Sequence, residues 1–161
     1  MNREFMRKAI ELARQNTKGD PYGAVIVKDG RIVATGVNET ASRNDPTAHA
    51  ELLAIQEAVR VLDTVDLEGC ELYSSNEPCS MCLSAVYRAN IKRVYFAEPL
   101  GEASKFIYDE LAKNHADRSL PTKWCPDHAE HNDFMKLAIR MAKENDKGGP
   151  YGAVIVKDGR I

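Results

Sequence analysis

The sequence predicts an α/β protein with three layers, in which helices cover both faces of a central sheet. Segments with the 3.6-residue period of helices alternate with short segments rich in Val and Ile, and this order favours an α/β/α sandwich. Asp29-Gly30 joins two of the apolar segments, so the first two strands are expected to form an antiparallel hairpin. The later strands are separated by helical segments, which serve as the crossovers that parallel strands need. We therefore expect a mixed sheet.

The N-terminal half supplies a helix, a hairpin and a second helix. Apolar residues from Phe5 to Ala13 recur at helical spacing, and the glycines and proline at 19–23 end this first helix. The hairpin strands are expected within 24–38. The stretch RNDPTAHA is predicted to be a loop, and AELLAIQEAVRVL at 50–62 is predicted to be a helix with one apolar side.

The C-terminal half continues the alternation. CELYSS at 70–75 predicts a strand, SMCLSAVYRAN at 80–90 a helix, and IKRVYFAE at 91–98 a strand of alternating character. A further helical pattern covers 103–114, and Asn132–Asn145 is predicted to form the last helix. Each helical segment after the hairpin is thus available to cover a face of the sheet.

Length, charge and composition exclude several classes of protein. A chain of 161 residues suits one compact domain, and a net charge of −2 gives no strong attraction to nucleic acid. No apolar run reaches the about 20 residues of a membrane span, and the first residues lack the apolar core of a signal peptide. We expect a cytoplasmic protein with reduced cysteines, in which closely spaced cysteines indicate metal binding or catalysis.

The twelve residues PYGAVIVKDGRI occur twice, at Pro21–Ile32 and at Pro150–Ile161. The repeat is shifted by 129 positions and extends back into the first helix, where eight of the sixteen residues of Phe5–Asp20 recur. The second copy has no HxE and no PCxxC, so it cannot form a second active site. We expect one domain over residues 1–147 and, over 148–161, a tail that is a truncated repeat of residues 19–32. Its apolar strand could pair with a sheet edge of its own or another subunit.

Two motifs carry the candidate chemistry, HAE at His49–Glu51 and EPCSMC at Glu77–Cys82. Two cysteines separated by two residues let both thiolates reach one metal ion, and the preceding proline favours a helix that begins at Cys79. With His49 as a third ligand, a tetrahedral zinc ion keeps one position open, which is typical of a catalytic site. Glu51 would then carry protons. Residues two apart diverge on a regular helix, so HAE must lie in a first helical turn.

An HxE before one helix, followed by a PCxxC that opens the next, is a pattern of zinc-dependent deaminases. On the motifs NDPTAHAE and EPCSMCLSA, the chain resembles the cytidine and deoxycytidylate deaminase superfamily, and within it the guanine deaminases and tRNA adenosine deaminases. The resemblance extends from about Phe5 to Phe134. It implies a mixed five-stranded central sheet and one Zn²⁺ per active site, held by His49, Cys79 and Cys82.

The resemblance also implies a reaction and its partners. Zinc would lower the pKa of a water molecule from about 15.7 toward about 7, which makes hydroxide available. Glu51 would take the proton and pass it to a ring nitrogen and then to the departing ammonia. The substrate would be a small aminated heterocycle, with water as co-substrate. We expect a homodimer, with C-terminal segments exchanged as in some relatives, and neither a membrane nor a nucleic acid as partner.

Six residues are predicted to contact the substrate: Asn38, Tyr22, Ala48, Glu77, Trp124 and Glu130. Asn38 matches a family asparagine that hydrogen-bonds the base, and Tyr22 lies where guanine deaminases have an aromatic residue that stacks on the purine. Trp124 and Glu130 belong to a C-terminal segment that covers the active site in the family. Together with FIYDEL at Phe106–Leu111 and RSLP at Arg118–Pro121, which resemble the guanine deaminases, these matches favour guanine, which would give xanthine and ammonia.

One departure from the guanine deaminase pattern leaves the substrate open. The relatives have acidic residues just before FIY, where this chain has Ala103–Lys105. Either Glu102 is shifted into that place, or Glu77 or Glu130 takes over, or the substrate is not guanine. Editing of adenosine in tRNA and deamination of cytosine remain alternatives. A zinc-binding interaction module without catalysis is a further alternative, although such a module has no use for Glu51.

Overall fold

The structure is a computed structural model that describes residues 2–114, 117–120, 133–146, 148, 151–158 and 160–161. The chain contacts divide it into two compact units, Met1–Lys113 and Asn114–Ile161. The domain boundary expected after residue 147 stays a prediction. Within the described part of the chain, no helix has both the length and the apolar character that crossing a membrane requires.

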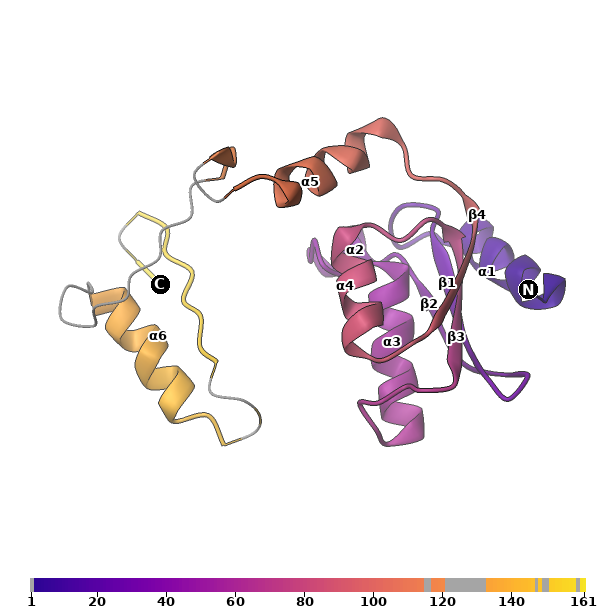
Figure 1. Cartoon of the computed structure of the whole chain (residues 1–161), viewed down its shortest axis with the longest axis horizontal. Helices are drawn as coiled ribbons and strands as arrows, with labels where there is room; N and C mark the ends of the chain where they lie inside the picture. Colours follow the sequence, from indigo (N-terminus) through magenta and orange to yellow (C-terminus); the bar gives the residue numbers. More distant parts are fainter. Residues whose placement is uncertain (1, 115–116, 121–132, 147, 149–150, 159) are drawn as a thin grey trace. The chain divides into compact units, whose positions relative to one another are not determined.

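The first unit contains four strands and five helices among the described residues (Figure 1). In chain order they are α1 (Arg3–Gln15), β1 (Gly23–Lys28), β2 (Arg31–Val37), α2 (Thr40–Arg43), α3 (Ala50–Leu62), β3 (Cys70–Asn76), α4 (Ser80–Arg88), β4 (Arg93–Glu98) and α5 (Glu102–Ala112). All the predicted helices and strands of this region are present. The one-turn helix α2 was not predicted, because four residues show no helical period.

The sheet is mixed, as predicted, with the strand order β2-β1-β3-β4. β1 pairs antiparallel with both β2 and β3, while β3 and β4 run parallel across the α4 crossover. The hairpin turn between β1 and β2 has positive φ at both Asp29 and Gly30, which is the conformation that this dipeptide favours.

The expected number of five strands is corrected to four in the described part of the chain. The sequence predicts four strands before the repeated segment, and only the family resemblance implied a fifth in the sheet. After β4, Pro99 interrupts the backbone donors that a longer strand would need, and the chain turns into α5.

Helices cover both faces of the sheet, which confirms the three layers. α1 lies on one face, where Phe5, Met6 and Ala9 pack against Val25, Val27 and Tyr73. α3 and α4 lie on the other face and bury a second cluster that includes Ile26, Leu72 and Val86. Because β1 alternates its side chains between these two clusters, the strand is buried on both sides. This explains why its sequence is continuously apolar.

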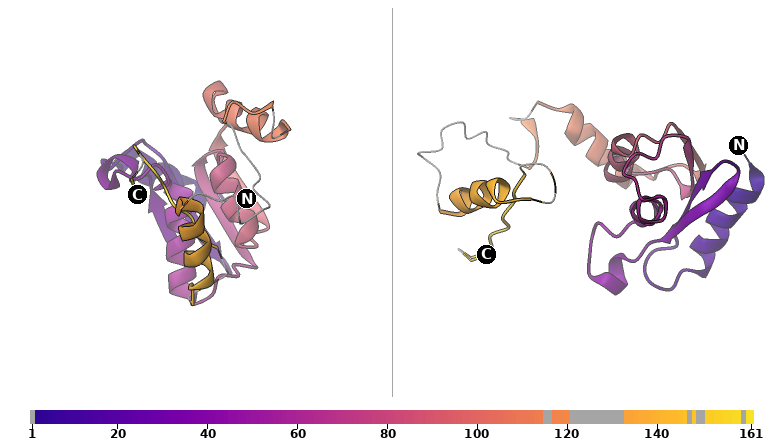
Figure 2. Two further views of the ribbon diagram at one scale, coloured as in Figure 1. Left: turned by 90° about the vertical axis from the view of Figure 1, so that its left-hand side faces the viewer. Right: turned by 90° about the horizontal axis from the view of Figure 1, so that it is seen from below.

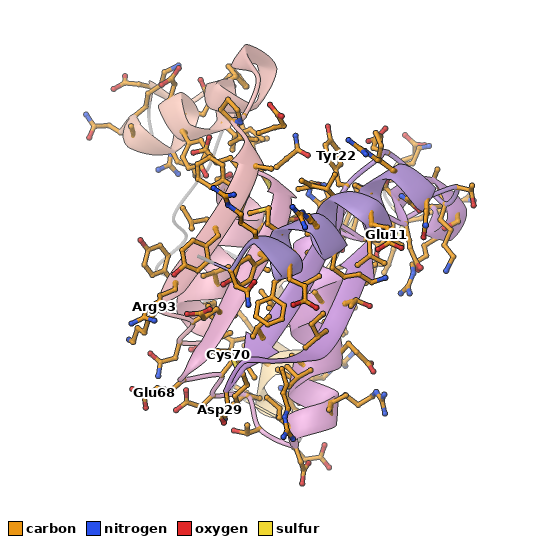
Figure 3. All side chains as sticks on the ribbon, turned by 90° about the vertical axis from the view of Figure 1, so that its right-hand side faces the viewer. Glu11, Tyr22, Asp29, Glu68, Cys70 and Arg93 are labelled. Carbon is orange, nitrogen blue, oxygen red and sulfur yellow. The ribbon has the colours of Figure 1, made fainter. Side chains whose placement is uncertain are left out.

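The two ends of the sheet differ in what they carry. Figure 3 shows Asp29, Glu68 and Cys70 at one end and Tyr22 toward the other. β1 begins next to Tyr22, and β3 and β4 both finish at this end, because Asn76 pairs with Glu98. The segments that follow two parallel strands therefore leave the sheet side by side, which is the usual place for a site in an α/β fold.

The second unit contains α6 (Asp133–Lys143) and the extended residues that follow it. Figure 2 shows these residues beside α6. A Cβ atom added to Gly152 would come within 2.2 Å of the Ala138 oxygen, so helix and extended chain are in direct backbone contact. Residues 151–156 form no strand, and an isolated bridge joins Lys157 and Arg160.

Candidate active site

The starts of two helices bring three candidate metal ligands together. His49 is the residue before α3, Cys79 is the residue before α4, and Cys82 lies in the first turn of α4. The ligand atoms of these three side chains all lie within 4.8 Å of one another. Helix N-termini favour negative charge, so the two thiols are placed where thiolates are stabilised.

The distances between these atoms fit a tetrahedral zinc ion. His49 Nδ1 lies 3.7 Å from Cys79 Sγ and 3.6 Å from Cys82 Sγ. Zinc bonds of about 2.3 Å to sulfur and about 2.05 Å to nitrogen, at a tetrahedral angle, place the sulfur and nitrogen atoms about 3.6 Å apart. The three side chains therefore leave a space of the right size for this ion, with a fourth position for another ligand.

The proton arrangement in the cluster agrees with thiolate chemistry. The hydrogen bond from Cys82, aided by His49, lowers the pKa of the Cys79 thiol to about 4. The same contact with Cys79, together with burial, raises the pKa of Cys82. The hydrogen bond with Cys79 raises the pKa of the His49 imidazole. The Cys79 thiol is thus the more readily deprotonated of the two candidate sulfur ligands.

Glu51 lies beside the two thiols and is nearly removed from solvent, with 6% of its surface exposed. Its Oε1 accepts a hydrogen bond from Ser74 Oγ at 3.2 Å, and its Oε2 accepts one from Cys82 Sγ at 3.5 Å. Burial raises the pKa of this carboxyl group above its usual range. A carboxyl group with a raised pKa exchanges protons more readily near neutral pH, which suits a general acid and base.

The structure also resolves how His49 and Glu51 can act on one site. His49 has extended backbone angles, φ −75° and ψ 151°, and only Glu51 lies within the helix. Because His49 lies outside the helix, its side chain and that of Glu51 do not follow helical geometry. They therefore need not point in different directions, as two side chains at this spacing on a regular helix would. HAE lies at the first helical turn, as the sequence analysis required.

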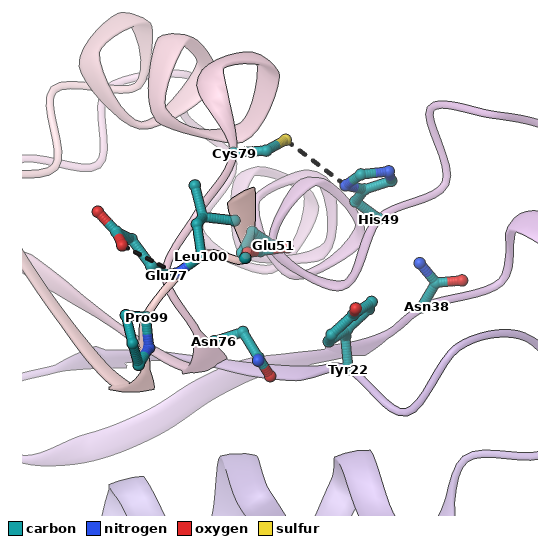
Figure 4. A pocket seen from close by; sticks show the side chains of 10 residues that line it. Tyr22, Asn38, His49, Glu51, Asn76, Glu77, Cys79, Pro99 and Leu100 are labelled. Carbon is teal, nitrogen blue, oxygen red and sulfur yellow. Dashed lines mark hydrogen bonds between the residues drawn. The ribbon is translucent and has the colours of Figure 1, made fainter. Parts of the chain in front are cut away.

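A small pocket opens beside these residues (Figure 4). Its volume is about 120 Å³, whereas pockets for drug-sized ligands begin at about 300 Å³. It therefore suits a ligand of one compact ring system. The lining residues come from five segments of the first unit: Tyr22, Asn38, His49, Glu51, Asn76, Glu77, Cys79, Pro99, Leu100 and Gly101.

Asn38 is held in one orientation at the pocket by its neighbours. Its side-chain oxygen accepts hydrogen bonds from the backbone nitrogen of Thr40 at 3.1 Å and from Thr40 Oγ1 at 2.7 Å. The amide nitrogen is then the group that Asn38 presents to the pocket as a donor. The backbone N–H of Asn38 also donates to the backbone carbonyl oxygen of Tyr22 at 3.0 Å, so the two predicted substrate contacts are directly connected.

The other predicted substrate contacts have different outcomes. Glu77 lines the pocket. Ala48 is buried next to the candidate ligand His49, and its backbone groups bond to Asp45 and Glu39 within the same loop, so its contact with substrate stays a prediction. Trp124 and Glu130 lie outside the described residues, as do the side chains of 102–105, and their roles also stay predictions.

Four lining residues were missed by the sequence analysis: Asn76, Pro99, Leu100 and Gly101. A signal for them was present in the order of the elements. Asn76 ends β3, and Pro99–Gly101 directly follow β4. Because parallel strands end at the same edge of a sheet, the predicted parallel pair already placed these residues next to Cys79.

Comparisons with known proteins agree with this geometry. The family described as the cytidine and deoxycytidylate deaminase zinc-binding region matches residues 1–98. Guanine deaminase from Bacillus subtilis (strain 168) is 45% identical over 131 residues, which cover 75% of this chain and 84% of that protein. A tRNA-specific adenosine deaminase from Aquifex aeolicus (strain VF5) is 45% identical over 123 residues, which cover 71% of this chain and 82% of that one.

A solved structure supports the same relationship. The X-ray structure of guanine deaminase from Bacillus subtilis matches with a TM-score of 0.75 and 43% sequence identity, and the match covers 80% of this chain and 88% of that one. Sequence motifs, fold and site geometry therefore lead to one conclusion. The chain belongs to the cytidine and deoxycytidylate deaminase family of zinc-type hydrolases that act on C–N bonds.

Proposed function

We propose that this chain is a zinc-dependent deaminase that hydrolyses the amino group of a free purine base or nucleoside. Guanine is the first candidate, with xanthine and ammonia as products. The observation that carries the proposal is the convergence of three candidate ligands and the buried carboxyl group of Glu51 at one small pocket. A pocket of this size accepts a single ring system.

In this proposal His49, Cys79 and Cys82 hold one zinc ion. When bound there, zinc would supply an acidified water molecule as the nucleophile at neutral pH. Glu51 is the proton carrier: it accepts one proton from the attacking water and passes it to a ring nitrogen, then accepts the second proton from the new hydroxyl group on the attacked carbon and delivers it to the departing amine. Water and the aminated ring thus give the oxo product and ammonia. The buried position of Glu51 keeps its proton from exchanging freely with bulk solvent.

Tyr22 and Asn38 would orient the ring. The aromatic side chain of Tyr22 offers a face on which a base can stack, and the amide nitrogen of Asn38 can donate to a ring acceptor. Both residues lie on the same side of the pocket in Figure 4. The guanine deaminase from Bacillus subtilis covers more of this chain than the tRNA-specific enzyme from Aquifex aeolicus does. This difference favours the free base.

Adenosine in tRNA is the second candidate. The observation in its favour is the 45% identity to the tRNA-specific adenosine deaminase, which equals the identity to guanine deaminase. Against it stands the net charge of −2, because proteins that bind tRNA usually carry a basic surface.

A panel of substrates tests the proposal. Ammonia release is measured for the zinc-loaded chain with guanine, guanosine, adenine, adenosine, cytosine and a tRNA anticodon stem-loop. We expect guanine to give the highest kcat/KM. Preferential release from the stem-loop contradicts the free base as substrate. Release from none of them, at full zinc occupancy, contradicts the enzyme and favours a zinc-binding interaction module.

The proposal also includes a homodimer as the working form. The described part of the chain leaves several large apolar side chains exposed on α4, β4 and α5, among them Tyr87, Phe96 and Phe106. A second subunit would shield such a surface. Sedimentation equilibrium measures the mass directly, and a monomer at all concentrations contradicts this part of the proposal.

A further inference from the structure

Glu77 makes two hydrogen bonds to the chain that leaves β4. Its backbone N–H donates to the Glu98 oxygen at 2.7 Å. Its side-chain Oε2 accepts from the Leu100 backbone N–H at 3.0 Å, as Figure 4 shows. Pro99 lies between these two partners and has no N–H of its own. Glu77 therefore holds the backbone on both sides of the one residue that cannot donate a hydrogen bond.

The segment that Glu77 holds forms a wall of the pocket. Pro99, Leu100 and Gly101 all line it, and Figure 4 shows Pro99 and Leu100 on the other side of the pocket from Asn38. Pro99 and Gly101 are exposed and Leu100 is half-buried. Such a segment gains little from packing, so the hydrogen bonds to Glu77 contribute a large part of what keeps it in place.

A further hydrogen bond connects α5 to Pro78, the residue that follows Glu77. The Tyr108 hydroxyl group donates to the Pro78 oxygen at 3.1 Å. Pro78 is buried and directly precedes Cys79. The dipeptide Glu77-Pro78 thus anchors both the wall segment and the helix that follows it, at the turn that also presents a candidate metal ligand.

We propose that Glu77 is a positioning residue for the deaminase reaction: its carboxylate holds Pro99–Gly101 as the wall against which the substrate ring binds, and Tyr108 supports this wall from α5. The inference rests on the proposed function of the pocket as the substrate site, but not on which amine is the substrate. This role needs only a hydrogen-bond acceptor at position 77. A direct contact between Glu77 and the substrate would instead depend on the negative charge of the side chain.

Three substitutions test this role: Glu77→Ala, Glu77→Gln and Tyr108→Phe. For the best substrate of the panel, Glu77→Ala is expected to raise KM about tenfold, the size of one lost charge-assisted hydrogen bond, and to change kcat less than about threefold. Glu77→Gln keeps an oxygen that accepts from Leu100, so its KM should stay near that of the unmodified chain. Tyr108→Phe should raise KM by about threefold.

Zinc content and the urea midpoint are measured for each variant, and both are expected to match the unmodified chain. Equal rises of KM in Glu77→Gln and Glu77→Ala would show that the charge matters and would overturn the positioning role. A fall of kcat at constant KM in Glu77→Ala would overturn it as well. If Glu77→Ala fails to fold, the test is made with Tyr108→Phe, and an unchanged KM in that variant would contradict the positioning role.

Hydrogen exchange separates this inference from the proposed function. Protection of the Leu100 amide is expected to fall about tenfold in Glu77→Ala and to persist in Glu77→Gln, because only the alanine removes the acceptor. This result does not require turnover. If the chain releases no ammonia but the Leu100 amide loses protection only in Glu77→Ala, the proposed function alone is contradicted. If protection of the Leu100 amide is unchanged in Glu77→Ala, the inference is contradicted.

Discussion

Pro21–Ile32 and Pro150–Ile161 have the same twelve residues but different surroundings. In the first copy the strand lies between β2 and β3 and under α1, and Ile26 is 0% exposed. In the second copy the equivalent Ile155 is 87% exposed, and residues 151–156 pair with no strand in the described part of the chain. The same apolar residues are thus core in one unit and surface in the other.

Local features are nevertheless the same in both copies. The Gly23 backbone lies against Ala9 and Ala13 of α1, and the Gly152 backbone lies against the matching Ala138 and Ala142 of α6. Asp29 and Asp158 both have φ 50°. The four buried residues of α1, Phe5, Met6, Ala9 and Ala13, recur at the matching positions of α6. Helix, close glycine contact and turn therefore follow from the local sequence, whereas burial depends on strands supplied from elsewhere.

The largest expected effect concerns the chemistry that only the first unit carries. Residues 133–161 contain no histidine and no cysteine, so no second site can compensate for a loss at the first. Glu51→Gln is expected to lower kcat by about 10²- to 10⁴-fold, because the amide cannot carry protons. Zinc content, measured by atomic absorption, should stay at one per chain. If Glu51→Gln retains most of the activity, Glu51 is not the proton carrier.

Paired truncations of the repeated isoleucine sharpen the contrast in burial. Ile26→Ala should lower the free energy of unfolding by about 2–5 kcal/mol, because it leaves a cavity between β1 and α3. Ile155→Ala should change it by less than about 0.5 kcal/mol, because the side chain is already in solvent. Equilibrium unfolding in urea measures both. Equal losses in the two variants would mean that the second copy is packed as tightly as the first.

The smallest expected effect compares Tyr22 with Tyr151. Tyr22 lines the pocket and Tyr151 is 83% exposed. Tyr22→Ala is expected to raise KM about tenfold by removing the stacking face, and Tyr22→Phe should keep KM near its starting value. Tyr151→Ala is the matched control and should leave kinetics unchanged. If KM rises in Tyr151→Ala and not in Tyr22→Ala, the second copy contributes to substrate binding.

Sequence patterns predicted most of the fold because the relevant signals are local. All the described helices except the one-turn α2 follow apolar periodicity, and the β1–β2 turn follows from Asp29-Gly30. The parallel pairing of β3 and β4 follows from the intervening helix. The fifth strand is the error within the described part of the chain, because it came from resemblance alone.

The candidate site was predicted in part. His49, Cys79 and Cys82 were identified because ligand type and spacing are visible in the sequence, and the structure brings their ligand atoms together. The wall at Pro99–Gly101 was missed because these residues bear no catalytic groups. Their place at the pocket results from strand order and from the hydrogen bond between Glu77 and Leu100.

The sequence by itself determined the three candidate ligands, the candidate proton carrier Glu51 and the helices that present them, since motif spacing and periodicity act over a few residues. Only the tertiary structure decided that His49 and Glu51 face one pocket, that β4 delivers its wall, and that one copy of a repeated strand is buried while the other is exposed. These outcomes depend on contacts between residues far apart in the chain. A strand becomes core only where neighbouring strands and helices remove it from water.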